Sequence, residues 1–217
     1  MNHTTWRLRR LTAMALLIAL AYASVFFIRV PVVLFLNYEP KDVILAIGAF
    51  LFGPIAGAGM ATTVALIELI TISTTGMIGL IMNILSSCLF VCTASFIYHR
   101  KRTLGGAIAG LLCGTILMTC AMVLWNYLIT PLYMTVPRQE IAGMLLTVFA
   151  PFNLLKGALN ATLTVILYKS VSSVLRSARL LPPVDSRTNK RKSAVWIISI
   201  FVFCTLILLL LLWKGII

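Results

Sequence analysis

The sequence predicts an all-α polytopic membrane protein. Of its 217 residues, 61% are hydrophobic and only 11% are charged, a balance that differs from that of soluble domains of this size. Several apolar runs approach the roughly 20 residues that a helix needs to cross a bilayer. The sequence shows no series of alternating strands of about ten residues, the pattern of a transmembrane barrel. We therefore expect a single helical membrane domain.

Seven apolar runs predict seven membrane spans, of which the first six form the main domain, residues 1–170. The spans cover about residues 11–28, 43–53, 55–72, 78–98, 104–127, 151–170 and 194–213. The first run is too long for a cleavable signal peptide and lacks a clear cleavage site. The second is short because Gly53-Pro54 breaks a helix, whereas Pro151 suits the first turn of the sixth. Residues 128–150 are expected to be an outer loop, amphipathic from residue 138 onward.

Two further segments follow the sixth span. Residues 171–193 are polar, contain Pro182-Pro183 and a basic cluster, and are interpreted as a cytoplasmic linker. Residues 194–217 hold the predicted seventh transmembrane helix, which has almost no polar side chain. This extra helix is expected to anchor or pack rather than to form part of a transport pathway.

Positively charged residues gather in the segments before the first span, between the fourth and fifth, and after the sixth. They are Arg7, Arg9, Arg10, Arg100, Lys101, Arg102, Lys169, Arg176, Arg179, Arg187, Lys190, Arg191 and Lys192. Loops rich in lysine and arginine stay in the cytoplasm, so the N-terminus is predicted to be cytoplasmic. This placement explains the net charge of +13 without nucleic acid. Binding of anionic lipid or RNA by residues 187–192 is the alternative.

Small residues recur every four positions in two spans. They are Ala15, Ala19 and Ala23 in the first span, and Gly106, Gly110 and Gly114 in the fifth. Such spacing keeps small side chains near one helix face, where a second helix can approach closely. Each stripe either packs inside the bundle or forms a docking surface for a partner subunit.

Polar residues at membrane depth indicate a site. Asn153, Lys156 and Asn160 follow i, i+3, i+7 spacing and share one face of the sixth span. Lys156 lies thirteen residues before Lys169, roughly 20 Å, which places it in the outer third of a bilayer core about 30 Å thick. Asn83 lies at a similar depth. An ionisable residue inside the membrane is expensive and indicates a functional site.

The predicted site opens outward and suits a neutral, hydroxyl-rich solute with a flat ring. Amides and an ammonium group bind hydroxyls, and the aromatic side chains of Tyr38, Trp125, Tyr127 and Tyr133 can enclose a ring. Three other interpretations remain. Asn126 and Tyr127 can belong to the interfacial belt. Lys156 can extend to the interface or pair with Asp42, and Asn83 can join two helices.

No catalytic or metal-binding pattern competes with this interpretation. The sequence lacks a G-x-x-x-x-G-K-[ST] phosphate loop, an H-E-x-x-H motif and a G-x-S-x-G motif. The five cysteines lie in apolar runs without a histidine or carboxylate that would complete a metal site. We therefore expect neither an enzyme nor a metal or cofactor.

Five segments together resemble the riboflavin-binding substrate subunits (RibU) of energy-coupling factor (ECF) transporters. The segments are Tyr38-Glu-Pro-Lys-Asp42, Phe50-Leu-Phe-Gly-Pro54, Gly76-Met-Ile-Gly79 with Asn83, Trp125-Asn-Tyr-Leu-Ile-Thr-Pro-Leu-Tyr133 and Pro151-Phe-Asn-Leu-Leu-Lys-Gly157. The resemblance covers about residues 8–170, and the last two segments are the most specific. The chain differs at Leu80, where the family often has an acidic residue, and in its seventh span.

The resemblance implies a six-helix vitamin-binding bundle in a bacterial cell membrane, open to the outside. It implies a substrate site made of Tyr38, Gly79, Asn83, Asn126, Asn153 and Lys156. It assigns Ala15, Ala19 and Ala23 to docking on a transmembrane coupling subunit, which works with two cytoplasmic ATPases. Riboflavin is the implied ligand. A sister subunit for another vitamin is the main alternative, followed by a small membrane enzyme or a structural membrane protein.

Overall fold

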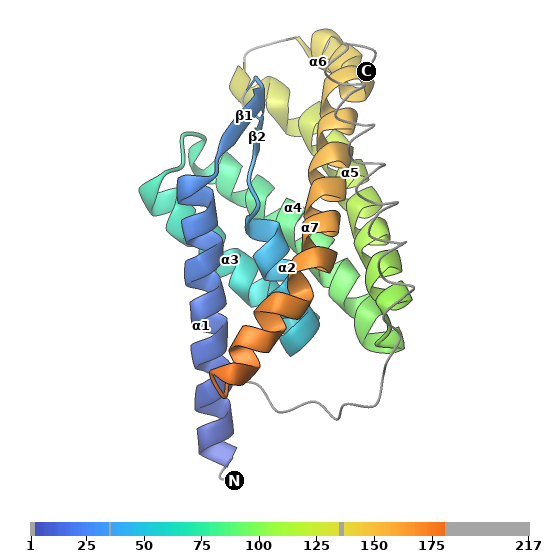
Figure 1. Ribbon diagram of the computed structural model, residues 1–217. Helices are drawn as coiled ribbons and strands as arrows, with labels where there is room; N and C mark the ends of the chain where they lie inside the picture. The colour runs from blue at the N-terminus through green and yellow to red at the C-terminus, as the bar shows by residue number, and fades with distance from the viewer. Residues whose placement is uncertain (1–2, 35, 135–136, 181–217) are drawn as a thin grey trace.

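The computed structural model describes residues 3–34, 36–134 and 137–180 (Figure 1). Five helical stretches in these residues are long and apolar enough to cross a membrane. They are Trp6–Phe27, Pro54–Thr71, Gly76–Lys101, Leu104–Leu132 and Arg138–Ser177. This confirms a helical polytopic membrane protein. Residues 181–193 of the predicted linker and the whole seventh span lie outside the described residues, whereas residues 171–177 of that linker are helical.

The elements form one bundle, with a short hairpin at one end. In chain order they are α1 (His3–Phe27), β1 (Val30–Val33), β2 (Leu36–Tyr38), α2 (Lys41–Phe52), α3 (Pro54–Thr71), α4 (Gly76–Lys101), α5 (Leu104–Met134), α6 (Arg138–Met144), the π-helix η1 (Leu145–Phe149) and α7 (Ala150–Ser177). In Figure 1, α1 and α5 lie at opposite sides of the bundle, with α2 and α7 between them. The packing of α2 against both α1 and α7 agrees with this arrangement.

The short second helix occupies the centre of the bundle. Helix α2 has 12 residues, so it is about 18 Å long and does not span a bilayer core by itself. Nine of its residues are buried, because α1, α3, α4 and α7 all pack against it. It ends at Gly53, whose φ of +99° favours glycine, and Pro54 then begins α3. The break predicted at Gly53-Pro54 is confirmed.

The first outer loop contains strands that the all-α prediction did not include. Val30 pairs with Tyr38 and Pro31 with Asn37 in an antiparallel hairpin. The β-branched residues of Val30–Val33 favour this extended conformation over a helix. The hairpin brings Tyr38 and Glu39 to the end of the bundle where α2 begins.

The prediction of an outer loop at residues 128–150 is wrong. Helix α5 continues to Met134 with Pro131 inside it, and only a short connection separates it from α6. Helices α6, η1 and α7 follow one another without a break, so Pro151 lies in the first turn of α7, as predicted, but after a π-helix rather than a loop. A proline lacks an N–H but is tolerated where a π-turn already disrupts the regular bonding.

The two stripes of small residues have different environments. A side chain on Gly110 would come within 2.5 Å of the carbonyl oxygen of Ala94, and one on Gly114 within 2.6 Å of that of Phe90. The glycines therefore allow α5 to pack closely on α4, as the bundle-packing interpretation predicts. On α1, in contrast, Ala15 and Ala19 are exposed.

Helix α1 faces the core with a different set of residues. Ala13, Leu17, Ala21 and Val25 are almost completely buried. They too recur every four positions, so the alanines at 15, 19 and 23 occupy another face of the same helix. This arrangement leaves the predicted docking stripe available to a partner.

Candidate functional site

A small cavity lies where the hairpin meets α4, α5 and α7. Four of the six predicted substrate residues line it, one or two from each of these helices: Asn83, Asn126, Asn153 and Lys156. Its free volume is about 50 Å³. That is enough for a few water molecules but far below the roughly 300–1,000 Å³ of typical small-molecule pockets. Four predicted substrate residues are therefore brought together around a small space, whereas Asn160, on the same predicted face as Asn153 and Lys156, does not line it.

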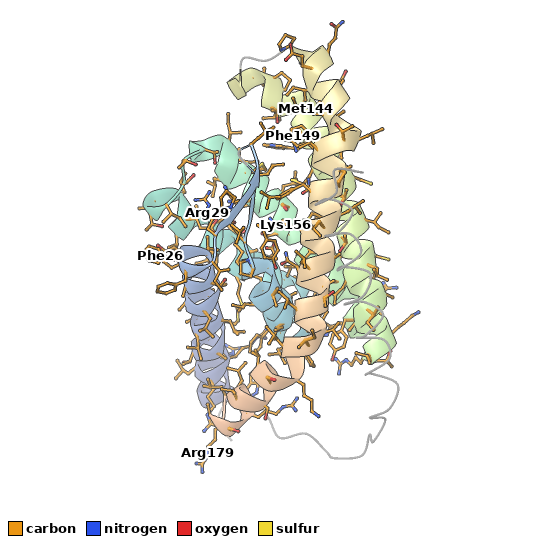
Figure 2. The ribbon with its side chains drawn as sticks, turned by 45° about the horizontal axis from the view of Figure 1, so that its top comes forward. Phe26, Arg29, Met144, Phe149, Lys156 and Arg179 are labelled. Atoms are coloured by element: carbon orange, nitrogen blue, oxygen red, sulfur yellow. The ribbon has the colours of Figure 1, made fainter. Side chains whose placement is uncertain are left out.

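Lys156 points from α7 into the bundle, at the end that also holds Arg29 (Figure 2). Its side chain is almost fully buried, and its Nζ lies 3.7 Å from Oδ2 of Asp42. Asp42 is completely buried and also accepts hydrogen bonds from Ser87 Oγ at 2.6 Å and Asn160 Nδ2 at 3.5 Å. Pairing with Asp42, one of the alternatives for Lys156, is present. Asp42 thus joins α2 to both α4 and α7.

The two asparagines on α5 and α7 are held by their own helices. Asn126 donates one N–H to the carbonyl of Met122 at 2.7 Å, and Asn153 donates one to that of Phe149 at 2.8 Å. Thr130 donates its hydroxyl to Asn126 Oδ1 at 2.8 Å. Because an amide has two N–H groups, each asparagine keeps a second donor beyond this bond. These local bonds fix the side chains at the cavity wall.

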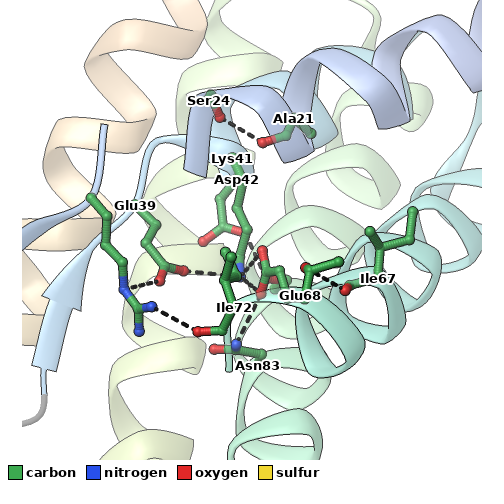
Figure 3. Close-up of polar contacts among 12 residues, drawn as sticks. Ala21, Ser24, Glu39, Lys41, Asp42, Ile67, Glu68, Ile72 and Asn83 are labelled. Carbon is green, nitrogen blue, oxygen red and sulfur yellow. Dashed lines mark hydrogen bonds and ion pairs between the residues drawn. The ribbon is translucent and has the colours of Figure 1, made fainter. Parts of the chain in front are cut away.

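Next to the cavity lies a set of buried charges centred on Lys41 (Figure 3). The Lys41 ammonium lies 2.7 and 2.6 Å from the two carboxylate oxygens of Glu68 and 3.0 Å from Glu39. Asn83 donates to Glu68 at 3.1 Å, and Arg29 pairs with Glu39 at 3.3 Å. Asn83 therefore joins α4 to α3 through Glu68, as its interpretation as a link between two helices predicts, while it also lines the cavity.

We refer to six charged residues as the ion network: Arg29, Glu39, Lys41, Asp42, Glu68 and Lys156. They include three of the five acidic residues in the sequence. Burying ions is costly unless each one is paired and hydrogen-bonded, and here each has an opposite charge within 3.7 Å. Sequence reasoning anticipated only the pair between Lys156 and Asp42 and missed the rest of this network, because it assigned residues 39–42 to a loop. The sequence did contain one signal, Glu68. It is a lone carboxylate inside a predicted span, and a carboxylate in that position requires a cation as its partner.

Two predicted substrate residues do not line the cavity. The Tyr38 hydroxyl instead donates to Oδ1 of Asn160 at 3.1 Å. Burial, with the charge of Asp42, raises the pKa of Tyr38 to about 12, so the phenol keeps its proton at neutral pH. Gly79 is buried behind Thr75, which itself lines the cavity and leaves no room for a side chain at Gly79.

Glu39 lines the cavity and stays ionised. Burial alone would raise its pKa, but the nearby charges of Lys41, Lys156 and Arg29 and a hydrogen bond from Lys41 lower it overall.

The aromatic side chains that were predicted to enclose a ring are only partly in place. Trp125 packs in the core, and Tyr127 is exposed, which fits the interfacial alternative for that residue.

Comparison with known proteins places the chain in a family. The family described as the substrate-specific component of ECF transporters matches residues 9–168, nearly three quarters of the sequence. The chain belongs to the ECF substrate-specific components. Members of this family are transporter components and not enzymes, which agrees with the expectation of no catalytic function.

Individual relatives of this ECF component agree with the family match. It is 30% identical over 177 residues to "Riboflavin transporter RibU" of Staphylococcus aureus (strain TCH60), covering 77% of this chain and 93% of the relative. It is 30% identical over 178 residues to "Riboflavin transporter RibU" of Streptococcus thermophilus (strain ATCC BAA-250 / LMG 18311), covering 77% and 84%. "Riboflavin transporter FmnP" of Bacillus subtilis (strain 168) is 29% identical over 132 residues, covering 57% and 70%.

A solved structure has the same fold. The structure described as "Structure and mechanism of the S component of a bacterial ECF transporter" superposes with a TM-score of 0.66 at 28% sequence identity. The match covers 78% of this chain and 99% of that one. The bundle described above is thus the fold of an ECF substrate component.

Proposed function

We propose that this chain binds riboflavin as the substrate subunit of an ECF transporter in a bacterial cell membrane. The observation that carries the proposal is the convergence of Asn126, Asn153 and Lys156 on one cavity at membrane depth. Two amides and an ammonium group match the hydroxyls of a ribityl chain. The names of three relatives, all riboflavin transporters, support the choice of ligand.

Binding requires the cavity to expand, because its present volume is too small for a flavin. The hairpin is the wall that we expect to move, since it is a short two-stranded element held by the packing of Leu36 against Phe149 and Phe152 and by a few polar contacts. These include the hydrogen bond from Tyr38 to Asn160 and the pair between Arg29 and Glu39. Tyr38 then acts as part of a lid, and Gly79 and Asn83 lie along the side of the ring.

We further propose that partner subunits supply the energy for uptake. A transmembrane coupling subunit would dock on Ala15, Ala19 and Ala23, and two cytoplasmic ATPases would hydrolyse ATP. The exposure of Ala15 and Ala19 supports this assignment. The basic ends of α1, α4 and α7 lie at the same end of the bundle in Figure 1, which supports a cytoplasmic N-terminus in a lipid bilayer. No nucleic acid is required as a partner.

Replacing Lys156 or Asn153 with alanine should weaken riboflavin binding by about 1–3 kcal/mol each, because each change removes a buried hydrogen bond to the ligand. Titration of the purified protein with riboflavin, followed by quenching of flavin fluorescence, measures this effect. Lys169→Ala is the matched control, since Lys169 is an exposed lysine on the same helix. Its affinity should equal that of the parent.

Two results would contradict the proposal in different ways. Parent-like affinity of Lys156→Ala and Asn153→Ala would show that riboflavin binds elsewhere. Absence of quenching from a folded parent protein would exclude riboflavin. A panel of other vitamins, tested by thermal stabilisation, would then identify the ligand of the same subunit.

A further inference from the structure

A second cavity lies at the other end of the bundle. It has a volume of about 310 Å³ and is formed near the C-terminal ends of α2, α4 and α7. The cavity at the candidate site is instead formed near the N-terminal ends of α4 and α7. The two cavities share no residue, so the second one is not part of the proposed riboflavin site.

The polar side chains of this second cavity are rich in hydrogen-bond donors and positive charge. They are Tyr98, His99, Arg102, Tyr168 and Arg176. The Tyr98 and Tyr168 hydroxyls lie 3.2 Å apart, and the His99 Nε2 lies 3.2 Å from the carbonyl oxygen of Ala49. Arginine can donate but never accept, and it keeps its charge in proteins. We call this space the basic cavity.

No carboxylate among the described residues neutralises the two arginines. Three of the acidic residues, Glu39, Asp42 and Glu68, belong to the ion network at the other end, and Glu140 is in α6. Asp185 is outside the described residues. The basic cavity is thus, over the part of the chain that the structure describes, a site of uncompensated positive charge.

Arg176 provides a second, independent indication of a ligand. Its Nε is buried and has no hydrogen-bond partner among the described residues. A buried donor without an acceptor costs about 1–3 kcal/mol, and such a group in a native protein calls for an explanation such as a bound ion. The attraction of cations to helix C-termini explains why arginines gather here but leaves this Nε without an acceptor.

The chemistry of the basic cavity favours a phosphate ester over a small ion. Two guanidinium groups can bind the oxygens of one phosphate in a bidentate manner. The volume is at the lower end of the roughly 300–1,000 Å³ typical of small-molecule sites, so it suits a phosphate with an organic group attached. Phe50 and Leu51 supply apolar walls, and the Phe50 ring lies 4.5 Å from that of Tyr98 between centroids.

We propose that the basic cavity binds the headgroup of an anionic phospholipid. Arg102 and Arg176 would hold the phosphate, and the hydroxyls of Tyr98 and Tyr168 would bond the alcohol groups of the headgroup. The cavity lies where the membrane helices end, which is the depth of lipid headgroups, and basic pockets between such helices bind anionic lipids. A soluble phosphate ester offers the same chemistry from another source.

Thermal unfolding of the full-length protein in detergent tests this proposal. Added phosphatidylglycerol should raise the melting temperature in a saturable manner, and phosphatidylcholine should not, because only a ligand that binds the folded state stabilises it. In the double variant Arg102→Gln, Arg176→Gln this shift should disappear. The matched control is Arg100→Gln, Lys101→Gln, which removes the same charge from residues adjacent to Arg102 that do not line the cavity. It should keep the shift.

Three other outcomes contradict the proposal. Equal loss of the shift in both double variants would indicate diffuse charge attraction, and no shift in the parent would exclude a lipid site. Stabilisation by glycerol phosphate and not by phosphatidylglycerol would show that the ligand is a soluble phosphate ester rather than a lipid. If the double variant fails to fold, Arg176→Lys keeps the charge without the bidentate geometry and should reduce the shift. None of these results depends on riboflavin binding.

Discussion

Replacing Lys41 with methionine should lower the free energy of unfolding by about 3–5 kcal/mol, the typical cost of removing one partner from a buried ion pair. Lys41 is 1% exposed and is the cation that lies between Glu39 and Glu68. Without it, Glu68 keeps the hydrogen bond from the Asn83 amide but has no cation as a partner among the described residues. Unfolding of the purified protein by heat or denaturant, followed by circular dichroism, measures the loss.

The double variant Lys41→Met, Glu68→Gln provides the internal comparison. It removes both charges, so it should recover much of the stability that Lys41→Met loses, since replacing a whole buried pair is often nearly neutral. Lys101→Met is the control for the loss of an exposed lysine and should change stability little. A small effect of Lys41→Met alone would mean that the ion network does not stabilise the bundle.

Replacing Ala19 with leucine should abolish riboflavin uptake by cells while riboflavin binding by the purified subunit stays at the parent level. Ala19 is exposed on α1, away from the core face formed by Leu17 and Ala21, so the larger side chain meets no other part of the subunit core. It would, however, prevent a coupling helix from approaching the small residues closely. Uptake of labelled riboflavin in cells that also produce the ECF partners measures the first effect, and fluorescence quenching measures the second.

The control makes the same change on another helix. Ala142 in α6 is also exposed, and Ala142→Leu should leave uptake intact. Normal uptake by Ala19→Leu would show that the alanine stripe is not the docking face. Loss of binding together with uptake would show that the leucine disturbs the bundle itself.

Helical spacing predicted more of the fold and the site than any other pattern in the sequence. It placed Asn153 and Lys156 on one face of α7, and both line the cavity. It failed where contacts join residues far apart in the chain. The bond from Ser87 to Asp42 joins positions 45 residues apart, and no local pattern specifies it. The hairpin was missed for a related reason, because strand pairing in an apolar loop depends on what the loop packs against.

The two stripes of small residues show the same limit. Spacing alone gave Ala15, Ala19 and Ala23 the same alternatives as the glycines of α5. Only burial separates them, because Gly110 touches the backbone of α4 and Ala19 is exposed. Identical periodicity therefore indicates a close approach of helices without saying whether the second helix belongs to the same chain.

The ion network has a consequence for the energetics of movement in an electric field. Its three carboxylates and three cations sum to a formal charge of zero. Moving one elementary charge across a membrane potential of 100 mV involves about 2.3 kcal/mol. If the subunit reorients in the bilayer during uptake, a neutral network that carries a neutral vitamin does no net electrical work of its own. Its contribution to the transport rate should then be the same at any membrane potential.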